Sequence, residues 1–200
     1  MRRIIGLTGG IGTGKTTVSN YLVSHYNLPV LDADIYAREA VQPGSEVLEE
    51  IQERYGLGIL LPDGKLDRLR LGQIVFSSPA ERLWLEQRIH PYVRDRITAQ
   101  LDTLDAQKYP TVVLVVPLLF EARMTDLVTE IWVVACDQTQ QVDRVKSRDG
   151  LPLEQIQSRI NSQMSIEKKL AQANVVLDNS STPEALLKQV DEAIGNCKKS

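Results

Sequence analysis

The sequence has few cysteines and no long apolar run. Its two cysteines, Cys136 and Cys197, match neither a disulfide framework nor a metal-binding spacing. A chain of 200 residues buries enough apolar surface to fold without disulfides, so we expect a reducing, cytoplasmic environment. No apolar stretch is long enough to span a bilayer. Gly6 interrupts the run that follows Arg2 and Arg3, which argues against an export signal.

An excess of positive charge is also absent. The formal net charge is −3, and the composition, 42% hydrophobic and 24% charged, is that of a globular protein. Without a basic face we expect no nucleic-acid partner, and without an apolar span we expect no membrane partner. No cluster of His, Cys, Asp and Glu has the spacing of a metal site.

The strongest motif that is present lies near the start of the chain, in residues 9–16. It fits the phosphate-loop pattern G-x-x-x-x-G-K-[ST] at every fixed position. Residues 3–8 before it have strand character, and residues 17–26 after it have helical spacing. In such a loop the backbone N–H groups and the helix N-terminus bind phosphates, Lys15 reaches the outer phosphates, and the Thr16 hydroxyl holds magnesium. We therefore predict a nucleotide site formed by Gly10, Ile11, Gly12, Thr13, Gly14, Lys15, Thr16 and Thr17.

Strands and helices alternate along the rest of the chain. Four further segments have strand character: 28–32, 111–116, 131–135 and 175–177. This alternation predicts an α/β fold of the P-loop type, in which helices cover both faces of a five-stranded parallel sheet. The core would comprise residues 1–44, 108–137 and 173–200, with a helical lobe at 45–107 and a charged helical lid at 138–172.

Two carboxylates follow the second predicted strand at a spacing of two. Because ligands of parallel sheets bind at the carboxyl ends of the strands, we expect Asp32 and Asp34 beside the phosphate loop. One carboxylate would accept the proton of an attacking hydroxyl, and the other would hold magnesium-bound water. The alternative is that one of them only caps the helix that follows.

Three arginines of the predicted lid form a second candidate group. Arg144 and Arg148 lie four residues apart on one helical face, and Arg159 follows. Guanidinium groups stabilise the charge of a phosphoryl group in transfer, and a closing lid would exclude water. The alternative is a solvated helix whose arginines pair with Asp143 and Asp149.

Two other residues are weaker candidates. His90 precedes Pro91, where we expect one helix to end and another to begin, so His90 is interpreted first as a capping residue. Glu121 follows the strand at 111–116 and would contact substrate or form a structural salt bridge.

These segments together resemble the dephospho-CoA kinase family over nearly the whole chain. The phosphate loop alone marks a very large class, and the order of the other motifs makes the resemblance specific. Asn174 stands where the family often has aspartate, a departure that is conservative in size. The matching segments are residues 6–18, 32–38, 66–68, 85–91, 116–121 and 173–179, with Phe76 and the lid residues Arg144, Arg148, Arg159 and Gln163.

The resemblance implies phosphorylation of the ribose 3′-hydroxyl of dephospho-CoA by ATP, with magnesium brought by the nucleotide. It also implies that the helical lobe at 45–107 binds the CoA moiety. Asp34 is implied as the base, and a monomer is expected, with an oligomer left open. Catalysis is assigned to Asp34, Lys15, Arg144 and Arg148, and ATP binding to the phosphate loop together with Arg144 and Arg148. Acceptor binding is assigned to Asp34, Arg38, His90, Glu121 and Arg159, and magnesium binding to Thr16 and Asp32.

Two other functions fit parts of the sequence. A kinase of another small acceptor, such as a nucleoside, would share the core and lid, but the lobe at 45–107 is large for a bare nucleotide. A nucleotide-dependent switch protein would need a guanine-reading Asn-Lys-x-Asp segment if it used GTP, and the sequence contains none.

Overall fold

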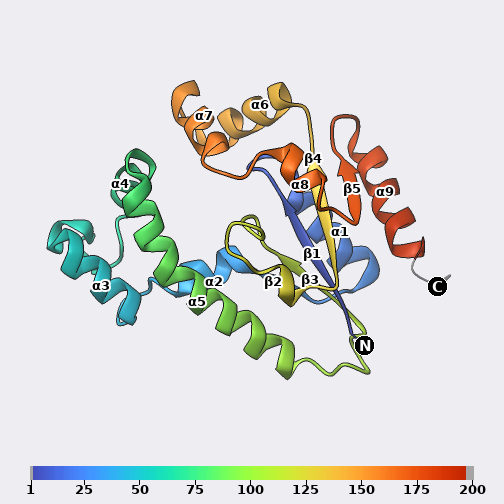
Figure 1. The fold of residues 1–200 in the computed structure, drawn as a ribbon, viewed down its shortest axis with the longest axis horizontal. Coiled ribbons are helices and arrows are strands. Elements are labelled where there is room, and N and C mark those ends of the chain that lie inside the picture. Colours follow the sequence, from blue (N-terminus) through green and yellow to red (C-terminus); the bar gives the residue numbers. More distant parts are fainter. Residues whose placement is uncertain (1, 197–200) are drawn as a thin grey trace. The chain divides into compact units, whose positions relative to one another are not determined.

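The computed structural model describes residues 2–196, so Cys197 lies outside the described residues (Figure 1). The chain forms two compact units. The first contains the chain up to Leu31 and from Leu104 onward, and the second is Asp32–Thr103. Residues 32–44, which we expected in the core, pack with the helical unit because α2 (Ala33–Glu39) contacts α5 (Pro79–Thr103).

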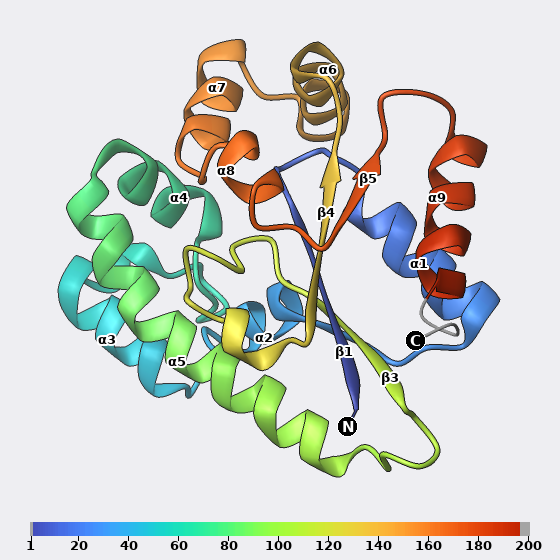
Figure 2. The ribbon, with the colours of Figure 1, turned by 45° about the vertical axis from the view of Figure 1, so that its right-hand side comes forward.

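A five-stranded sheet has the order β2-β3-β1-β4-β5. The central strand β1 pairs in parallel with β3 and β4, and β4 pairs in parallel with β5 (Figure 2). The order confirms the predicted α/β fold, in which every connection between neighbouring strands is a crossover. The strands are β1 (Arg3–Gly9), β2 (Val30–Asp32), β3 (Thr111–Val115), β4 (Glu130–Ala135) and β5 (Val175–Asp178).

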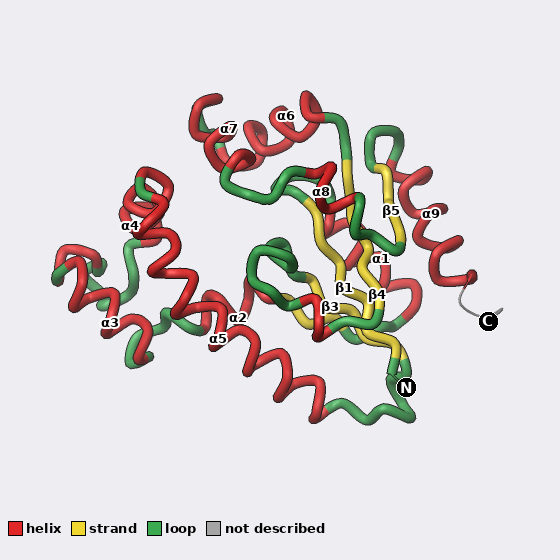
Figure 3. The backbone as a smooth tube through the Cα atoms, viewed as in Figure 1, coloured by secondary structure: helices red, strands yellow, loops and turns green. Residues whose placement is uncertain are grey.

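Alternate side chains of the central strands point to opposite faces of the sheet. On one face, Leu7 and Trp132 are fully buried in a cluster that includes α1 (Lys15–Tyr26) and α9 (Pro183–Asn196). On the other face, Gly6 lies against Leu119 and Val128, and α8 (Ile166–Leu170) packs against β4. Both faces of the sheet are therefore covered, as the tube in Figure 3 also shows.

The remaining helices of the first unit lie between β4 and β5 in the chain. They are α6 (Gln138–Asp149) and α7 (Leu153–Asn161), which pack against each other, and α8. Together they span the segment that we predicted as a helical lid. A short 3₁₀ helix, η2 (Thr125–Leu127), precedes β4.

The second unit is helical and has its own apolar core. Ile51, Ile59 and Leu71 are buried in it, and Trp84 and Ile89 pack against it. Its further elements are α3 (Glu46–Tyr55), the 3₁₀ helix η1 (Leu57–Ile59) and α4 (Arg68–Ser77). Across residues 2–196, no helix combines the length and apolarity needed to cross a membrane.

The expected helix boundary at His90 and Pro91 is wrong. α5 continues through Pro91, and His90 lies inside the helix rather than at its end. Proline removes one backbone hydrogen bond from a helix interior. The helix continues because both halves are packed: Ile89 contacts the unit's core, and Val93 and Ile97 are buried in the second half.

Candidate active site

The phosphate loop connects β1 to α1 and depends on glycine at specific positions. Gly9, Gly12 and Gly14 have φ values of 149°, 74° and 106°, a region that other residues rarely adopt. A Cβ atom on Gly9 would lie 2.3 Å from the Val134 carbonyl oxygen. Gly14 is the N-cap of α1, and no side chain caps the helix there. The first-turn N–H groups of α1 are thus presented to the loop, as a phosphate site requires.

The Lys15 side chain lies over the loop. Its Nζ donates hydrogen bonds to the carbonyl oxygens of Gly9, at 3.1 Å, and Gly10, at 2.8 Å. The Thr13 hydroxyl donates to the Gly10 carbonyl at 2.9 Å and is buried. The side chains of Thr16 and Thr17 are exposed at the start of α1. The arrangement places an ammonium group and hydroxyl groups around the loop, as phosphate and magnesium binding require.

A cavity of about 480 Å³ opens beside this loop within the first unit. Gly10 and Thr13 form one wall of the cavity. Residues of α6 and of the α7–α8 connection form further walls. Cys136 also lines it, and burial raises the pKa of its thiol, with Arg144 acting in the opposite direction. The cysteine therefore remains a protonated thiol near neutral pH, which argues against a reactive role.

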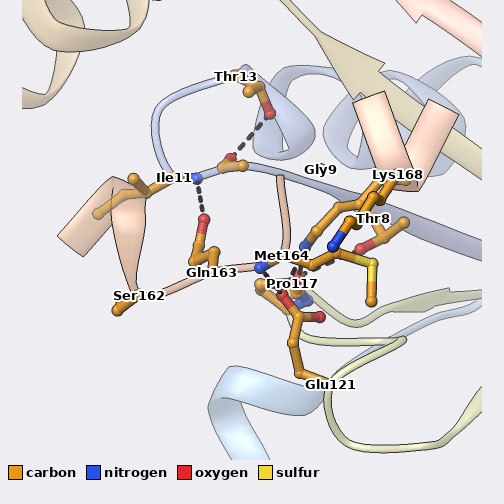
Figure 4. A network of polar contacts seen from close by, with 12 residues as sticks. Thr8, Gly9, Ile11, Thr13, Pro117, Glu121, Ser162, Gln163, Met164 and Lys168 are labelled. Carbon is orange, nitrogen blue, oxygen red and sulfur yellow. Dashed lines mark hydrogen bonds and ion pairs between the residues drawn. The ribbon is translucent and has the colours of Figure 1, made fainter. Parts of the chain in front are cut away.

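Two glutamine side chains hold the peptide at the tip of the loop. The Ile11 N–H donates to Oε1 of Gln163 at 2.9 Å (Figure 4), and Nε2 of Gln141 donates to the Ile11 carbonyl at 2.7 Å. Gln141 belongs to α6, and Gln163 lies between α7 and α8. The predicted lid is thus hydrogen-bonded to the phosphate loop. Sequence analysis missed Gln141, because no motif marks a contact that spans 130 residues.

Glu121 lies in a polar network next to that contact (Figure 4). Its Oε1 accepts a hydrogen bond from the Met164 N–H at 2.8 Å and lies 3.0 Å from Nζ of Lys169. Lys169, whose side chain is 1% exposed, also donates to the Pro117 carbonyl at 3.1 Å. The structure contains the salt bridge that was the alternative for Glu121, and its assignment to acceptor binding stays a prediction. Oε2 of Glu121 is buried without a partner within residues 2–196.

We expect Lys169→Met to destabilise the protein by about 2 kcal/mol, because it leaves the buried Glu121 carboxylate without its cation. The free energy of unfolding, measured by urea denaturation, tests this. The double variant Glu121→Gln/Lys169→Met should recover part of the loss, since no buried charge then remains. Additive losses in the double variant would show that the two groups do not interact.

The lid arginines have different partners. Arg144 donates from Nη2 to the Asn179 carbonyl at 3.0 Å, and its Nη1 is buried without a partner in the described part of the chain. Arg148 forms two hydrogen bonds to Asp149, at 2.7 and 2.9 Å, and Arg159 lies 3.6 Å from the same carboxylate. The Arg148 hydrogen bonds lower the pKa of Asp149. The alternative for this helix was pairing with Asp143 and Asp149. Arg148 and Arg159 do share the Asp149 carboxylate, whereas Asp143 forms no ion pair within residues 2–196.

The acidic segment opens the second unit. The Asp32 side chain accepts a hydrogen bond from the Asp34 N–H at 2.9 Å and so caps α2, and its assignment to magnesium stays a prediction. The Asp34 carboxylate is exposed and forms no hydrogen bond or ion pair with any residue from 2 to 196. It lines a cavity of about 350 Å³ together with Arg38 and Arg68. A carboxylate without internal partners is available to a substrate.

His90 does not line that cavity, although Leu85 and Ile89 of the same helix do. It is half-buried within α5. Its assignment to acceptor binding rests on the resemblance alone and stays a prediction.

Comparison with known proteins identifies a match that spans most of the chain. The family model of dephospho-CoA kinase (CoaE) matches residues 3–184. The dephospho-CoA kinase of Trichormus variabilis is 60% identical over 193 residues, which cover 96% of this chain and 97% of that protein. Two solved structures are also similar. TT1252 from Thermus thermophilus is 36% identical, with a TM-score of 0.80, over 98% of this chain and 97% of that one. Dephospho-CoA kinase from Campylobacter jejuni is 27% identical, with a TM-score of 0.72, over 100% and 98%.

Proposed function

The chain belongs to the dephospho-CoA kinase family, and from that premise we propose how its residues carry out the ATP-dependent phosphorylation of dephospho-CoA. The reaction moves the γ-phosphoryl group of ATP to the ribose 3′-hydroxyl and yields coenzyme A and ADP. The observation that carries the proposal is the complete phosphate loop between β1 and α1, in a chain that is 60% identical to a dephospho-CoA kinase over nearly its full length.

The nucleotide is assigned to the phosphate loop and the lid. Backbone N–H groups of residues 10–17 would bind the phosphates, and Lys15 would neutralise charge on the outer ones. Nη1 of Arg144 is buried without a partner within residues 2–196, which supports a role toward an anion, because a guanidinium N–H without an acceptor is costly. Arg148 would exchange Asp149 for the phosphoryl group when nucleotide binds.

Two side chains that were assigned to magnesium have suitable chemistry. Thr16 of the first unit has an exposed hydroxyl, and Asp32 of the second unit has a carboxylate, although one of its oxygens caps α2; each offers oxygen atoms, which this ion prefers. Within residues 2–196, no three His, Cys, Asp or Glu side chains group as a metal site, so the ATP phosphates and water would supply most ligands. Bound magnesium would neutralise charge on the transferring phosphoryl group.

Asp34 is proposed as the group that receives the acceptor's proton. A ribose hydroxyl is a weak nucleophile until its proton can leave, and a carboxylate within hydrogen-bond reach orients it and accepts that proton. The absence of a partner for the Asp34 carboxylate among residues 2–196 supports this role.

We further propose that the protein is cytoplasmic and monomeric. Light scattering of the purified chain would test whether it is a monomer.

The lid should become more ordered when substrates bind. Residues 138–170 carry many charges, and only Val145 of α6 and Ile156 of α7 are buried in those two helices. We expect amide hydrogen exchange there to slow by about tenfold with an ATP analogue and dephospho-CoA together. Exchange in α9 provides the internal control. If amide hydrogen exchange in residues 138–170 stayed unchanged with both ligands bound, the hypothesis that this segment is a lid would be refuted.

A panel of acceptors separates this function from its alternatives. Labelled ATP is offered with dephospho-CoA, adenosine or AMP, or with no acceptor. A dephospho-CoA kinase should label dephospho-CoA most efficiently, as judged by kcat/KM. A nucleoside or nucleotide kinase would prefer the small acceptors, and a switch protein would release phosphate slowly without labelling any acceptor.

A further inference from the structure

The two peptide units that flank Ile11 are each held by a glutamine side chain. The Ile11 N–H donates to Oε1 of Gln163 at 2.9 Å (Figure 4), and the Ile11 carbonyl accepts from Nε2 of Gln141 at 2.7 Å. Gln141 belongs to α6, and Gln163 follows α7. Both glutamines line the cavity of about 480 Å³ beside the phosphate loop. Two separate parts of the segment 138–172 therefore hold the same residue of the loop.

The first of these peptide units joins Gly10 to Ile11. Across residues 2–196 no peptide bond is cis, and the C=O and N–H of a planar trans unit point in opposite directions. The Gly10 carbonyl accepts a hydrogen bond from Nζ of Lys15 at 2.8 Å, so the Ile11 N–H points away from that ammonium group. Gln163 therefore binds the loop on the side opposite to the Lys15 ammonium group.

The second peptide unit joins Ile11 to Gly12. Because its carbonyl accepts a hydrogen bond from Gln141, its N–H points away from Gln141 by the same trans geometry. The two glutamines both line the cavity, so the Gly12 N–H is turned to the side of the loop on which Lys15 lies. That side is where we assign the phosphates. Gln141 thus directs a backbone donor toward the nucleotide without contacting the nucleotide itself.

The contact with α6 also explains two glycines at positions that the phosphate-loop pattern leaves variable. A Cβ atom on Gly10 would lie 2.6 Å from Nε2 of Gln141, so a side chain there would displace that donor from Ile11. A Cβ atom on Gly12 would lie 2.7 Å from Cγ2 of the buried Val145 and 3.1 Å from the Gln141 carbonyl oxygen. The helix α6 therefore packs against the loop at a distance that favours glycine at both positions.

The backbone beside Gln163 is held by a buried ion pair. The Met164 N–H donates to Oε1 of Glu121 at 2.8 Å (Figure 4), and the same oxygen lies 3.0 Å from Nζ of Lys169. The Lys169 side chain is only 1% exposed. Separating a buried ion pair is costly, because each charge is then left without its partner. The pair therefore fixes the segment from which Gln163 reaches the loop.

We propose that Gln141 and Gln163 are positioning residues of the nucleotide site, which orient the backbone N–H groups of the phosphate loop before ATP binds. A glycine-rich loop samples many backbone conformations, and ordering it at the moment of binding would reduce affinity. Gln141 must donate and Gln163 must accept, because their partners are a carbonyl oxygen and an N–H group. The inference rests on the proposed nucleotide site.

Glutamate at the two positions tests these opposite requirements. An ionised carboxylate accepts hydrogen bonds but cannot donate them. Gln163→Glu therefore keeps the hydrogen bond to the Ile11 N–H, whereas Gln141→Glu loses its bond and faces the Ile11 carbonyl oxygen. Each change adds one negative charge beside the loop, so the two variants are matched. We expect Gln141→Glu to weaken binding of adenylyl imidodiphosphate with magnesium by about tenfold more than Gln163→Glu does, as measured by isothermal titration calorimetry at neutral pH.

Methionine variants remove the hydrogen bonds without adding charge. Gln141→Met and Gln163→Met should each raise the Kd for adenylyl imidodiphosphate by about fivefold to tenfold. Their KM for dephospho-CoA and their melting temperatures should stay close to wild type, because the affected contacts lie at the loop and outside the apolar core. Gln157→Met is the matched control, since Gln157 is an exposed glutamine of α7 that does not line the cavity. It should leave the Kd unchanged.

The outcomes separate this proposal from the nucleotide site on which it rests. If the wild type does not bind adenylyl imidodiphosphate, the nucleotide site itself is wrong. If the wild type binds it and both methionine variants bind it equally well, only the positioning role is wrong. Equal losses in the two glutamate variants would overturn the proposal, because charge alone would then explain them. Lower melting temperatures with equal losses for both substrates would overturn it as well, because the glutamines would then be structural.

Discussion

Asp34→Asn is expected to lower the rate of phosphoryl transfer to dephospho-CoA by about a hundredfold or more, the usual scale for loss of a general base. Asparagine has nearly the same shape as aspartate but cannot accept the proton. The Asp34 carboxylate is exposed and forms no hydrogen bond or ion pair among residues 2–196, so the variant should fold normally. Single-turnover transfer measures the rate, and titration with an ATP analogue should give an affinity within a few-fold of wild type.

Asp32→Asn is the matched control for this experiment. Asp32 caps α2 through its side chain, and asparagine caps helices nearly as well. We therefore expect a smaller effect on the rate and a weaker response to magnesium. If Asp34→Asn retained transfer and Asp32→Asn abolished it, the two roles would be reversed. If both variants retained transfer, the two aspartates would act only in capping α2.

Lys15→Ala is expected to remove most phosphoryl transfer while the protein still unfolds cooperatively. The loss should be several kcal/mol of transition-state stabilisation, about the size seen when a preorganised donor is removed from an oxyanion site. Nζ of Lys15 donates to loop carbonyl oxygens, and Lys15 is not part of the apolar core, so the effect on stability should be small.

Lys188→Ala serves as the control for the Lys15 variant. Lys188 is an exposed lysine of α9, remote in sequence from the phosphate loop. Its removal changes the net charge equally and should leave both transfer and melting unchanged. A Lys15→Ala protein with near-normal transfer would contradict the phosphate-loop assignment.

The sheet and the phosphate loop could be predicted because their signals are local. The five apolar segments and the glycine pattern each lie within a few consecutive residues, and the structure has strands at all five. The start of α9 was also local: Pro183 is its first residue, and the Thr182 hydroxyl caps it at 3.2 Å.

Other features depend on tertiary contacts that no local pattern records. Pro91 suggested a break in α5, but burial on both sides of it outweighs the lost hydrogen bond. The helix α4 (Arg68–Ser77) lies in a segment for which the sequence analysis assigned no helix. The contacts of Gln141 and Lys169 join segments far apart in the chain, so only the folded structure reveals them.

The central claim is that this chain transfers phosphate from ATP to the 3′-hydroxyl of dephospho-CoA. The most direct measurement incubates the purified protein with ATP, magnesium and dephospho-CoA, then quantifies ADP and locates the new phosphate by ³¹P NMR. We predict equal amounts of ADP and of a product phosphorylated at the ribose 3′-oxygen, with neither formed when dephospho-CoA is omitted. ADP formation with unchanged dephospho-CoA, or phosphate at another hydroxyl, would contradict the claim.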